Sequence, residues 1–417
     1  MRFAEESRSA ATGARPKNIR QKNVSSIIQL FRTSDTLSAR TISDQTSLSK
    51  TSVNKILSQL THERIIENVG KGDSTEIGGK KPDLFALNSE QAYFITIVFT
   101  AHNINAALLN LKLEILHSAV SYHETPLDRE QLIVQLKDMV SHLLTISRIR
   151  ADRIDSIVLQ SGGVINKENE ALVIPIKDLN WKNNFPIRRL FMESLDFQPH
   201  VYFDNISRFF GYYELANDPS RSDKSLMIIS TLESAVGGSI LSNGSFDRGG
   251  HGLIGEFGHI CVDQNSPEPC HCGNHGCFEV MVTKRVVFKK AEELLGKYPS
   301  SSLAPLIRDG ALSFKAVFDA ADSGDALARE VLDNVIQYFY KVLYNAIFMI
   351  DPDEIIVQNL YAYPCAYFRE QLEERLGRSA LWKDIKLTYS QTDEYHSAHI
   401  GAALYAGDKY FDRLLNR

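Results

Sequence analysis

The sequence lacks the features of a membrane-spanning or secreted protein. None of its hydrophobic runs approaches the roughly eighteen consecutive apolar residues that mark a transmembrane helix. The first thirty residues are polar and rich in Ser and Arg, without the central apolar segment of a secretory signal. Repeats and low-complexity tracts are also missing. We therefore expect a globular cytoplasmic chain that has no membrane partner.

Cysteine is scarce, which excludes a disulfide scaffold. Five occur among 417 residues; Cys270, Cys272 and Cys277 fall within eight residues, whereas Cys261 and Cys365 stand apart. Clustered thiols in a reducing compartment are typical of a metal site. The alternatives are three reduced thiols without a ligand, or a disulfide between the first and third cysteines of the cluster, which a reducing compartment disfavours.

The composition is that of a globular protein, and its charge is unevenly spread. Hydrophobic residues make up 43% and charged residues 23% of the chain. At about 150 residues per domain, the length predicts two or three domains. Residues 1–90 contain 14 Lys and Arg against 10 Asp and Glu, a net charge of +4, and the remaining residues carry −9. A basic end on an acidic body favours contact of that end with a polyanion.

The N-terminal apolar pattern predicts three helices. Residues 1–17 have almost no apolar periodicity and are expected to form a flexible tail. Two later stripes have the i, i+3, i+4, i+7 spacing of a helix: Val24, Ile27, Ile28 and Phe31, and then Val53, Ile56, Leu57 and Leu60. A short helix at 39–46 fits between them with Ile42 inward, and Ser49 is placed to cap the third helix.

A β-hairpin is expected after these helices. Strand-like residues at 65–69 and 84–87 flank a glycine-rich polar turn at 70–79. Three helices followed by a short hairpin form a winged helix-turn-helix, which we place at residues 18–88. A small helical packing or oligomerisation module is the alternative.

The outward face of the third helix suits the major groove of DNA. Its apolar stripe packs inward, so the polar residues near the helix start remain available to base edges and phosphates. Lysines on the hairpin could approach the DNA backbone or minor groove. The predicted DNA contacts are Ser49, Lys50, Thr51, Ser52, Asn54 and Lys55 on the helix, and Lys71, Lys80 and Lys81 on the hairpin.

The rest of the chain alternates strands with helices. Strands are expected at 93–99, 104–111, 156–160, 201–203, 226–231 and 355–357, and helices at 129–148, 330–350 and 398–415. Such alternation predicts an α/β architecture with buried sheets.

The cysteine cluster favours a structural zinc site. Three thiolates and one imidazole complete a closed tetrahedral Zn²⁺ site with no position left for water. Gly273 and Gly276 allow the tight turns that bring the sulfurs together. Spacing alone leaves the fourth ligand open among His259, His271 and His275.

Two motifs carry a resemblance to a known family. The stretch from Cys270 to Glu279 matches the pattern CxCGxxGCxE, and residues 255–259 match GExGH. Both are signatures of the ROK family of repressors, open reading frames and sugar kinases, which the chain resembles over nearly its whole length. Looser landmarks of the family are Ser161-Gly162-Gly163-Val164, Asn180-Trp181 and Ile400-Gly401-Ala402-Ala403. The N-terminal region looks like the winged helix of the family's repressor branch.

The resemblance implies an actin/hexokinase-like domain at residues 89–417 that binds an effector and dimerises. Lobe one would comprise about 89–200 plus 398–417, and lobe two about 201–397. Family precedent makes His259 the fourth zinc ligand beside Cys270, Cys272 and Cys277. It also implies sugar contacts at Glu256, His259 and Glu279, and we expect Asn205 and Asn180 to add to them. Ordinary hydrogen bonding within the loop is the alternative role for the two glutamates.

Sugar kinases of this family need phosphate-binding turns and a catalytic aspartate, and both are altered here. The turn that begins D-x-G-G-T corresponds to residues 97–103, where Val98 replaces the acid and no glycine remains. A second glycine-rich turn contains Glu233, which would repel phosphates. The preferred register places Asn205 at the aspartate position, and an amide cannot act as a general base. A shift of one residue would make Asp204 the base instead.

These features predict a DNA-binding transcriptional regulator, a repressor of carbohydrate uptake or metabolism genes. Its partners would be double-stranded operator DNA, a sugar or sugar-phosphate effector or a sugar-transport protein, and a second copy of itself in a homodimer or a tetramer. One alternative is an ATP-dependent sugar kinase with an appended DNA-binding domain. Another is a zinc-stabilised interaction scaffold that shows no operator preference.

Overall fold

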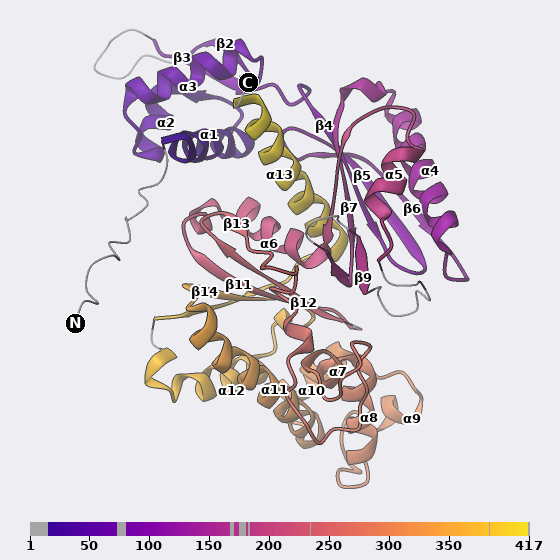
Figure 1. Ribbon diagram of the computed structural model, residues 1–417. Helices are drawn as coiled ribbons and strands as arrows, with labels where there is room; N and C mark the ends of the chain where they lie inside the picture. The colour runs from indigo at the N-terminus through magenta and orange to yellow at the C-terminus, as the bar shows by residue number, and fades with distance from the viewer. Residues whose placement is uncertain are drawn as a thin grey trace, which may run out of the picture. The chain divides into compact units, whose positions relative to one another are not determined.

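Three helices pack together at the N-terminal end of the computed structural model, which describes residues 16–72, 81–166, 171–174, 181, 184–233, 235–382 and 384–415. They are α1 (Pro16–Thr33), α2 (Ala39–Thr46) and α3 (Lys50–His62) (Figure 1). The side chain of Ser38 caps α2 and that of Ser49 caps α3, each accepting a hydrogen bond from a backbone N–H three residues on. Both apolar stripes are buried, as the spacing predicted.

A small antiparallel sheet accompanies these helices. Its strands are β1 (Leu37–Ser38), β2 (Ile66–Lys71) and β3 (Asp83–Leu87), in the order β1-β3-β2. The predicted strands that flank the turn are thereby confirmed. The tip of the turn, with Lys80, lies outside the described residues.

The chain divides into two units, and the smaller one gathers three separate segments. It contains Met1–Tyr93, Leu109–Glu114 and Ala406–Arg417, and the larger contains Phe94–Leu108 and Ile115–Tyr405. The two later segments of the smaller unit belong, by sequence, to the region that resembles the family's effector domain. Helix α13 (Glu394–Leu415) therefore begins in the larger unit and ends in the smaller one.

Arg32 joins these segments inside the smaller unit. Its side chain lies at the end of α1, and the residue is only 9% exposed. The guanidinium donates from Nε to the carbonyl of Leu111 at 3.4 Å and lies 6.0 Å from the ring of Phe411. A long cationic side chain that is this buried must find acceptors within the protein. Arg32 finds them at the carbonyl of Leu111 and at Oε1 of Gln29, which lies 3.3 Å from Nη1.

Two five-stranded sheets lie mostly in the larger unit. The first has the order β10-β7-β4-β5-β6, and β10 pairs with β7 in parallel so that Asn205 lies opposite Ser161. Its strands are β4 (Tyr93–Phe99), β5 (Asn103–Asn110), β6 (Ile115–Tyr122), β7 (Ile154–Ser161) and β10 (His200–Asn205). Helices α4 (Arg129–Ser147) and α5 (Ile187–Ser194) accompany it, and β8 (Val164–Ile165) and β9 (Leu172–Ile174) form a separate short pair. Strand β6 was not predicted, because this edge strand is exposed along most of its length and has no continuous apolar run.

The second sheet has the order β13-β12-β11-β14-β15 and mixes both strand directions. Strand β11 is antiparallel to β12 and parallel to β14. The strands are β11 (Ser225–Thr231), β12 (Val236–Ser242), β13 (Ser245–Phe246), β14 (Glu354–Asn359) and β15 (Lys386–Ser390). The core packs this sheet against α7 (Phe278–Val282), α8 (Lys284–Leu294), α10 (Phe314–Asp322), α11 (Ala326–Ile350) and α12 (Ala366–Gly377), with α9 (Ala304–Arg308) nearby in the chain (Figure 1). Mixed helices and strands confirm the α/β prediction.

Close backbone approach fixes α6 (Ile206–Asn217) against β12. A Cβ atom on Gly237 would lie 1.9 Å from Oγ of Ser207, and one on Gly211 would lie 2.5 Å from Oγ of Ser239. These two glycines are therefore required for the helix to pack this closely on the strand. Among the described helices, none combines the length and apolar content that crossing a bilayer requires.

The smaller unit should lose stability as Asp408 ionises. Burial raises the pKa of this carboxyl from 3.8 to about 6, with Arg32 opposing the rise and Asp412 adding to it. A carboxyl whose pKa is raised on folding contributes stability that is full below its unfolded pKa and is lost as the pH rises through the folded pKa. We expect the free energy of unfolding of Asp408→Asn, measured with urea, to rise by about 1–2 kcal/mol relative to that of the wild type when the pH is raised from 4 to 7.5.

Asp44→Asn is the matched control, since Asp44 is an exposed carboxylate in the same unit. In Asp44→Asn, the free energy of unfolding should change between pH 4 and pH 7.5 by the same amount as in the wild type. Parallel pH profiles for the wild type and Asp408→Asn would contradict the assignment.

Candidate functional site

A cavity of about 870 Å³ lies in the larger unit. Its walls come from the carboxyl ends of β4, β7, β10, β11 and β14, together with the first residues of β12 and α6. Ligands in open α/β sheets bind at the carboxyl ends of the strands. The parallel pairing of β10 with β7 brings Asn205 to this edge beside Gly162 and Gly163.

Asn205 is the central polar residue of the cavity wall. Its Oδ1 accepts a hydrogen bond from the backbone N–H of Ser207 at 2.9 Å and so caps α6. Its Nδ2 donates to the carbonyl of Gly163 at 2.8 Å and to Oε1 of Glu256 at 3.4 Å. The amide thus links α6, the turn after β7 and the segment before the cysteine cluster. Only an amide can accept and donate in this way.

Asp204, the other candidate for the catalytic base, is held away from the cavity by two arginines. The residue is 2% exposed and is not among the described residues that line the cavity. Its carboxylate pairs with Arg208 one turn along α6, and with Nη2 of Arg248 at 2.5 Å. Two guanidinium groups therefore hold this carboxylate in place. Asn205 lines the cavity and Asp204 does not. The register that places Asn205 at the aspartate position stays a prediction.

Two glutamates face the cavity near Asn205. Glu279 accepts a hydrogen bond from the backbone N–H of Val236 at 3.0 Å and lies 3.3 Å from Nδ1 of His271. Burial raises the pKa of Glu256 to about 7; Glu279 and Asp204 add to this rise, and Arg208 and His271 oppose it. A cation held by the neighbouring cysteine cluster would also oppose the rise. Both glutamates offer acceptor oxygens to a ligand with hydroxyl groups.

The turn at residues 97–103, which the sequence predicts to correspond to the phosphate-binding turn of the kinases, is closed by the side chain of Thr100. The hydroxyl of Thr100 accepts from the backbone N–H groups of His102 and Asn103, at 3.2 and 3.1 Å. Backbone N–H groups are what such turns offer to phosphate oxygens. Here two of them are already occupied. At the second glycine-rich turn, the carboxylate of Glu233 lines the cavity and lies 3.4 Å from Nζ of Lys284.

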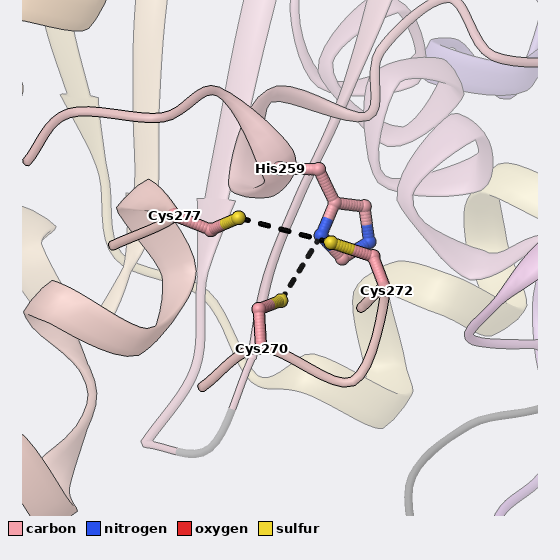
Figure 2. A group of neighbouring side chains, drawn as sticks. All are labelled: His259, Cys270, Cys272 and Cys277. Atoms are coloured by element: carbon pink, nitrogen blue, oxygen red, sulfur yellow. Dashed lines mark hydrogen bonds between the residues drawn. The ribbon is translucent and has the colours of Figure 1, made fainter. Parts of the chain in front are cut away.

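The three clustered thiols and one imidazole lie together beside the cavity. The ligand atoms of His259, Cys270, Cys272 and Cys277 all lie within 4.8 Å of one another, and the four residues form a group that can hold a metal ion (Figure 2). Nδ1 of His259 is 3.4 Å from the sulfur of Cys270, and the sulfurs of Cys272 and Cys277 are 3.8 Å apart. Gly276 permits the turn, because a Cβ atom there would lie 1.8 Å from the carbonyl oxygen of Asp263.

The other two histidines that spacing left open are not members of this four-residue group. His271 belongs to a second possible group with Cys270 and Glu279, and its ring centroid is 4.9 Å from that of His259. His275 is in neither group among the described residues. His271 also lines the cavity, a position that its place between two cysteines in the sequence did not indicate.

Most of the residues predicted to contact DNA lie on one exposed surface of α3. Ser49, Lys50, Thr51, Ser52, Asn54 and Lys55 are all exposed, whereas the intervening apolar residues are buried. Ser49 uses its hydroxyl as the helix cap. On the hairpin, Lys81 is exposed and Lys71 pairs with Asp83 at 2.5 Å, a contact that the sequence did not indicate. The predicted sugar contact Asn180 lies outside the described residues.

Comparison with known proteins places these features in a family. Residues 94–409 match the ROK family. The xylose repressor of Bacillus spizizenii is 23% identical over 326 residues, which cover 78% of each chain. The crystal structure of a ROK family transcriptional regulator, a homolog of the E. coli MLC protein, superposes with a TM-score of 0.75 at 21% identity, covering 96% of this chain and all of that one.

Kinases share the same fold. The crystal structure of a ROK family glucokinase from Streptomyces griseus, in complex with glucose and AMPPNP, gives a TM-score of 0.60 at 18% identity and covers 75% of this chain and 98% of that one. It lacks a match to about a quarter of the present chain, whereas the regulator covers almost all of it. The family match spans well over half of the sequence and includes the cavity and the cysteine cluster. The chain belongs to the ROK family.

Proposed function

We propose that this chain is a cytoplasmic DNA-binding transcriptional regulator that represses carbohydrate uptake or metabolism genes. A sugar, a sugar phosphate or a sugar-transport protein controls it by binding the ROK domain. The observation that carries the proposal is the closed turn at Thr100, next to a cavity that keeps its sugar-facing groups. The similarity to the xylose repressor and to the regulator structure supports it.

Each segment of the chain has its own proposed role. Residues 1–17 form a tail, residues 18–88 a winged helix-turn-helix that reads DNA, and residues 89–417 the effector-binding and dimerisation domain. In this arrangement α3 enters the major groove with its exposed polar surface, and Lys71, Lys80 and Lys81 on the wing contact the backbone. A homodimer, or a tetramer built from two dimers, would present two such helices to a pseudo-palindromic operator.

The proposed effector site is the part of the cavity around Asn205. Asn205, Glu256, His259 and Glu279 surround it, and Asn180 is proposed to complete it. Carboxylate and amide oxygens bind vicinal hydroxyl groups well. The proposal assigns no catalytic step to the chain. Asn205 cannot remove a proton, and Asp204 is held by Arg208 and Arg248.

Zn²⁺ is the metal that the cysteine cluster fits. A tetrahedral ion with Zn–S bonds of about 2.3 Å holds its sulfur ligands about 3.8 Å apart. The sulfurs of Cys272 and Cys277 have this separation. Burial raises the pKa of the thiols of Cys270 and Cys277, so a bound cation is needed to keep them ionised. With His259 as the fourth ligand the site is closed and would serve to hold the loop.

Removing one thiol should release the metal and loosen the larger unit. We expect Cys272→Ser to lose its zinc and to unfold at a temperature several degrees lower, because the loop loses a ligand and the remaining buried thiols lose their cation. Metal analysis and thermal unfolding measure both effects. Cys261→Ser is the control, since Cys261 is exposed and outside the cluster. Full zinc content in Cys272→Ser would show that this residue is not a ligand.

Changes on α3 should weaken operator binding selectively. Operator sites are first selected from random duplexes with the purified chain. Lys50→Ala should then weaken binding to them by about 1–3 kcal/mol, as for loss of a base contact, and leave the zinc content unchanged. Lys81→Ala should weaken binding to all DNA sequences alike. It should also reduce the slope of log affinity against log salt concentration by the amount that about one phosphate contact contributes.

Lys290→Ala serves as the control, because Lys290 lies on α8 in the larger unit and pairs with Glu293. It should bind the selected operator like the wild type. Unchanged operator affinity in Lys50→Ala would mean that α3 is wrongly placed as the recognition helix. Binding with no preference among duplexes at any salt concentration would favour the scaffold alternative.

The kinase alternative predicts ATP turnover, which we expect to be absent. The wild type and Asn205→Asp are each incubated with ATP and a panel of hexoses, with a ROK glucokinase as the positive control. Neither should turn over ATP, because restoring the aspartate does not free the two backbone N–H groups that Thr100 occupies. Hexose-dependent turnover by the wild type would refute the regulator-only function.

A further inference from the structure

The cavity is much larger than one sugar ring. A hexose has twelve heavy atoms, and even at the roughly 30 Å³ that a water molecule takes up in the liquid they would fill only about 360 Å³. The cavity measures about 870 Å³. More than half of it therefore remains when one ring lies against Asn205 and the two glutamates. This remaining part contains the residues that correspond to the phosphate-binding turns of the kinases.

The walls of this second part carry hydrogen-bonding groups suited to hydroxyls. The hydroxyl of Thr392 donates to Oδ1 of Asn359 at 3.1 Å, while Nδ2 of Asn359 is buried and has no hydrogen-bond partner among the described residues. Asn359 also has a φ of +63°, an uncommon conformation for a residue other than glycine. The neighbouring Tyr395 donates its hydroxyl to Oδ1 of Asn103 at 3.3 Å. All three lining residues present donors or acceptors without a formal charge.

Charge at this part of the cavity opposes a phosphorylated ligand. Glu233 and Glu394 both line it, and burial, with a smaller contribution from Asp393, raises the pKa of Glu394. Lys315 is the only lysine or arginine among the described lining residues, and its ammonium group is mostly exposed and pairs with Asp319 at 2.5 Å. A phosphate would meet carboxylates here, and two backbone N–H groups of the turn at Thr100 are already occupied.

An aromatic ring completes the second part. Tyr363 lines the cavity and stacks on Phe318, with ring centroids 5.4 Å apart and an interplanar angle of 14°. Its hydroxyl donates to Asp319 at 3.0 Å, which fixes the orientation of the ring. The negative face of an aromatic ring attracts the C–H groups on the apolar face of a sugar. Aromatic rings with a few fixed polar groups are the usual walls of small-molecule sites.

We propose that the effector is a neutral carbohydrate of at least two sugar units. The first unit binds at Asn205, Glu256 and Glu279. The second lies on Tyr363 and hydrogen-bonds with Asn359 and Thr392, in the part of the cavity that corresponds to the nucleotide site of the kinases. This inference rests on the proposed function and identifies the class of effector that the ROK domain binds.

The test compares each monosaccharide with its own disaccharides. Isothermal titration of the zinc-loaded full chain uses glucose with maltose and cellobiose, xylose with xylobiose, and N-acetylglucosamine with chitobiose. Glucose 6-phosphate is the anionic probe. We expect at least one disaccharide to bind about ten-fold or more tightly than its monosaccharide, and the phosphate to bind more weakly than glucose.

Variants separate the two parts of the cavity. Tyr363→Ala should reduce the affinity for the disaccharide to that for the monosaccharide and leave the monosaccharide unchanged, whereas Tyr363→Phe should retain the preference. Glu256→Gln should weaken both sugars. If Tyr363→Ala does not fold, Thr392→Val provides the same comparison with little change in volume and should lower the affinity for the disaccharide several-fold.

Each of the other outcomes refutes one part of the proposal. Equal binding of mono- and disaccharides, or equal weakening of both by Tyr363→Ala, refutes the second subsite while the proposed function stands. Tightest binding of glucose 6-phosphate refutes the neutral character of the effector. If no sugar of either length binds, the sugar-responsive form of the proposed function fails as well.

Discussion

The cavity depends on the amide of Asn205. One side-chain group accepts from the start of α6, donates to the turn after β7 and donates to Glu256. An aspartate at this position could still cap the helix, but it would bring a second carboxylate against Glu256, whose pKa burial already raises to about 7. The amide removes that repulsion and adds a donor. In the register that the sequence predicts, this amide also lies where a kinase has its catalytic aspartate, and an amide cannot take a proton from a sugar hydroxyl.

The cysteine cluster supports the same wall of the cavity. Cys277 precedes α7 directly, and Glu279 in the first turn of that helix accepts from the backbone of Val236 on β12. Strand β12 in turn packs against α6, where Gly237 leaves just enough room for Ser207. A metal that holds Cys277 therefore also fixes Glu279, and through it the position of β12. Of the cluster's four residues only His259 is also a proposed sugar contact, but the cluster's geometry determines where the carboxylate of Glu279 lies.

Sequence patterns predicted the parts of this structure that depend on local spacing. The apolar stripes of α1 and α3 follow the helical repeat, and the cysteine motif placed the thiols within a few residues of one another, so both could be anticipated. The partners of Asn205 could not, because Gly163 and Glu256 are 42 and 51 residues away in the chain. Arg248, which pairs with the carboxylate of Asp204, does not belong to any recognisable motif. Tyr363 and Thr392 also have no local pattern, since they reach the cavity only because β14 and α13 end or begin at its edge.

Helix α13 begins beside the cavity in the larger unit and ends in the smaller unit. Tyr395, in its first turn, lines the cavity, and His399, one turn later, is buried and contacts Thr96 of β4 at 2.7 Å. Its last turns contain Asp408 and Phe411, which surround the buried Arg32 of α1. A helix transmits a displacement of one end to the other because its backbone hydrogen bonds resist bending. In the proposed function, a ligand in this cavity can affect DNA binding only if its binding free energy differs between two arrangements of the chain, for example through different contacts with Tyr395.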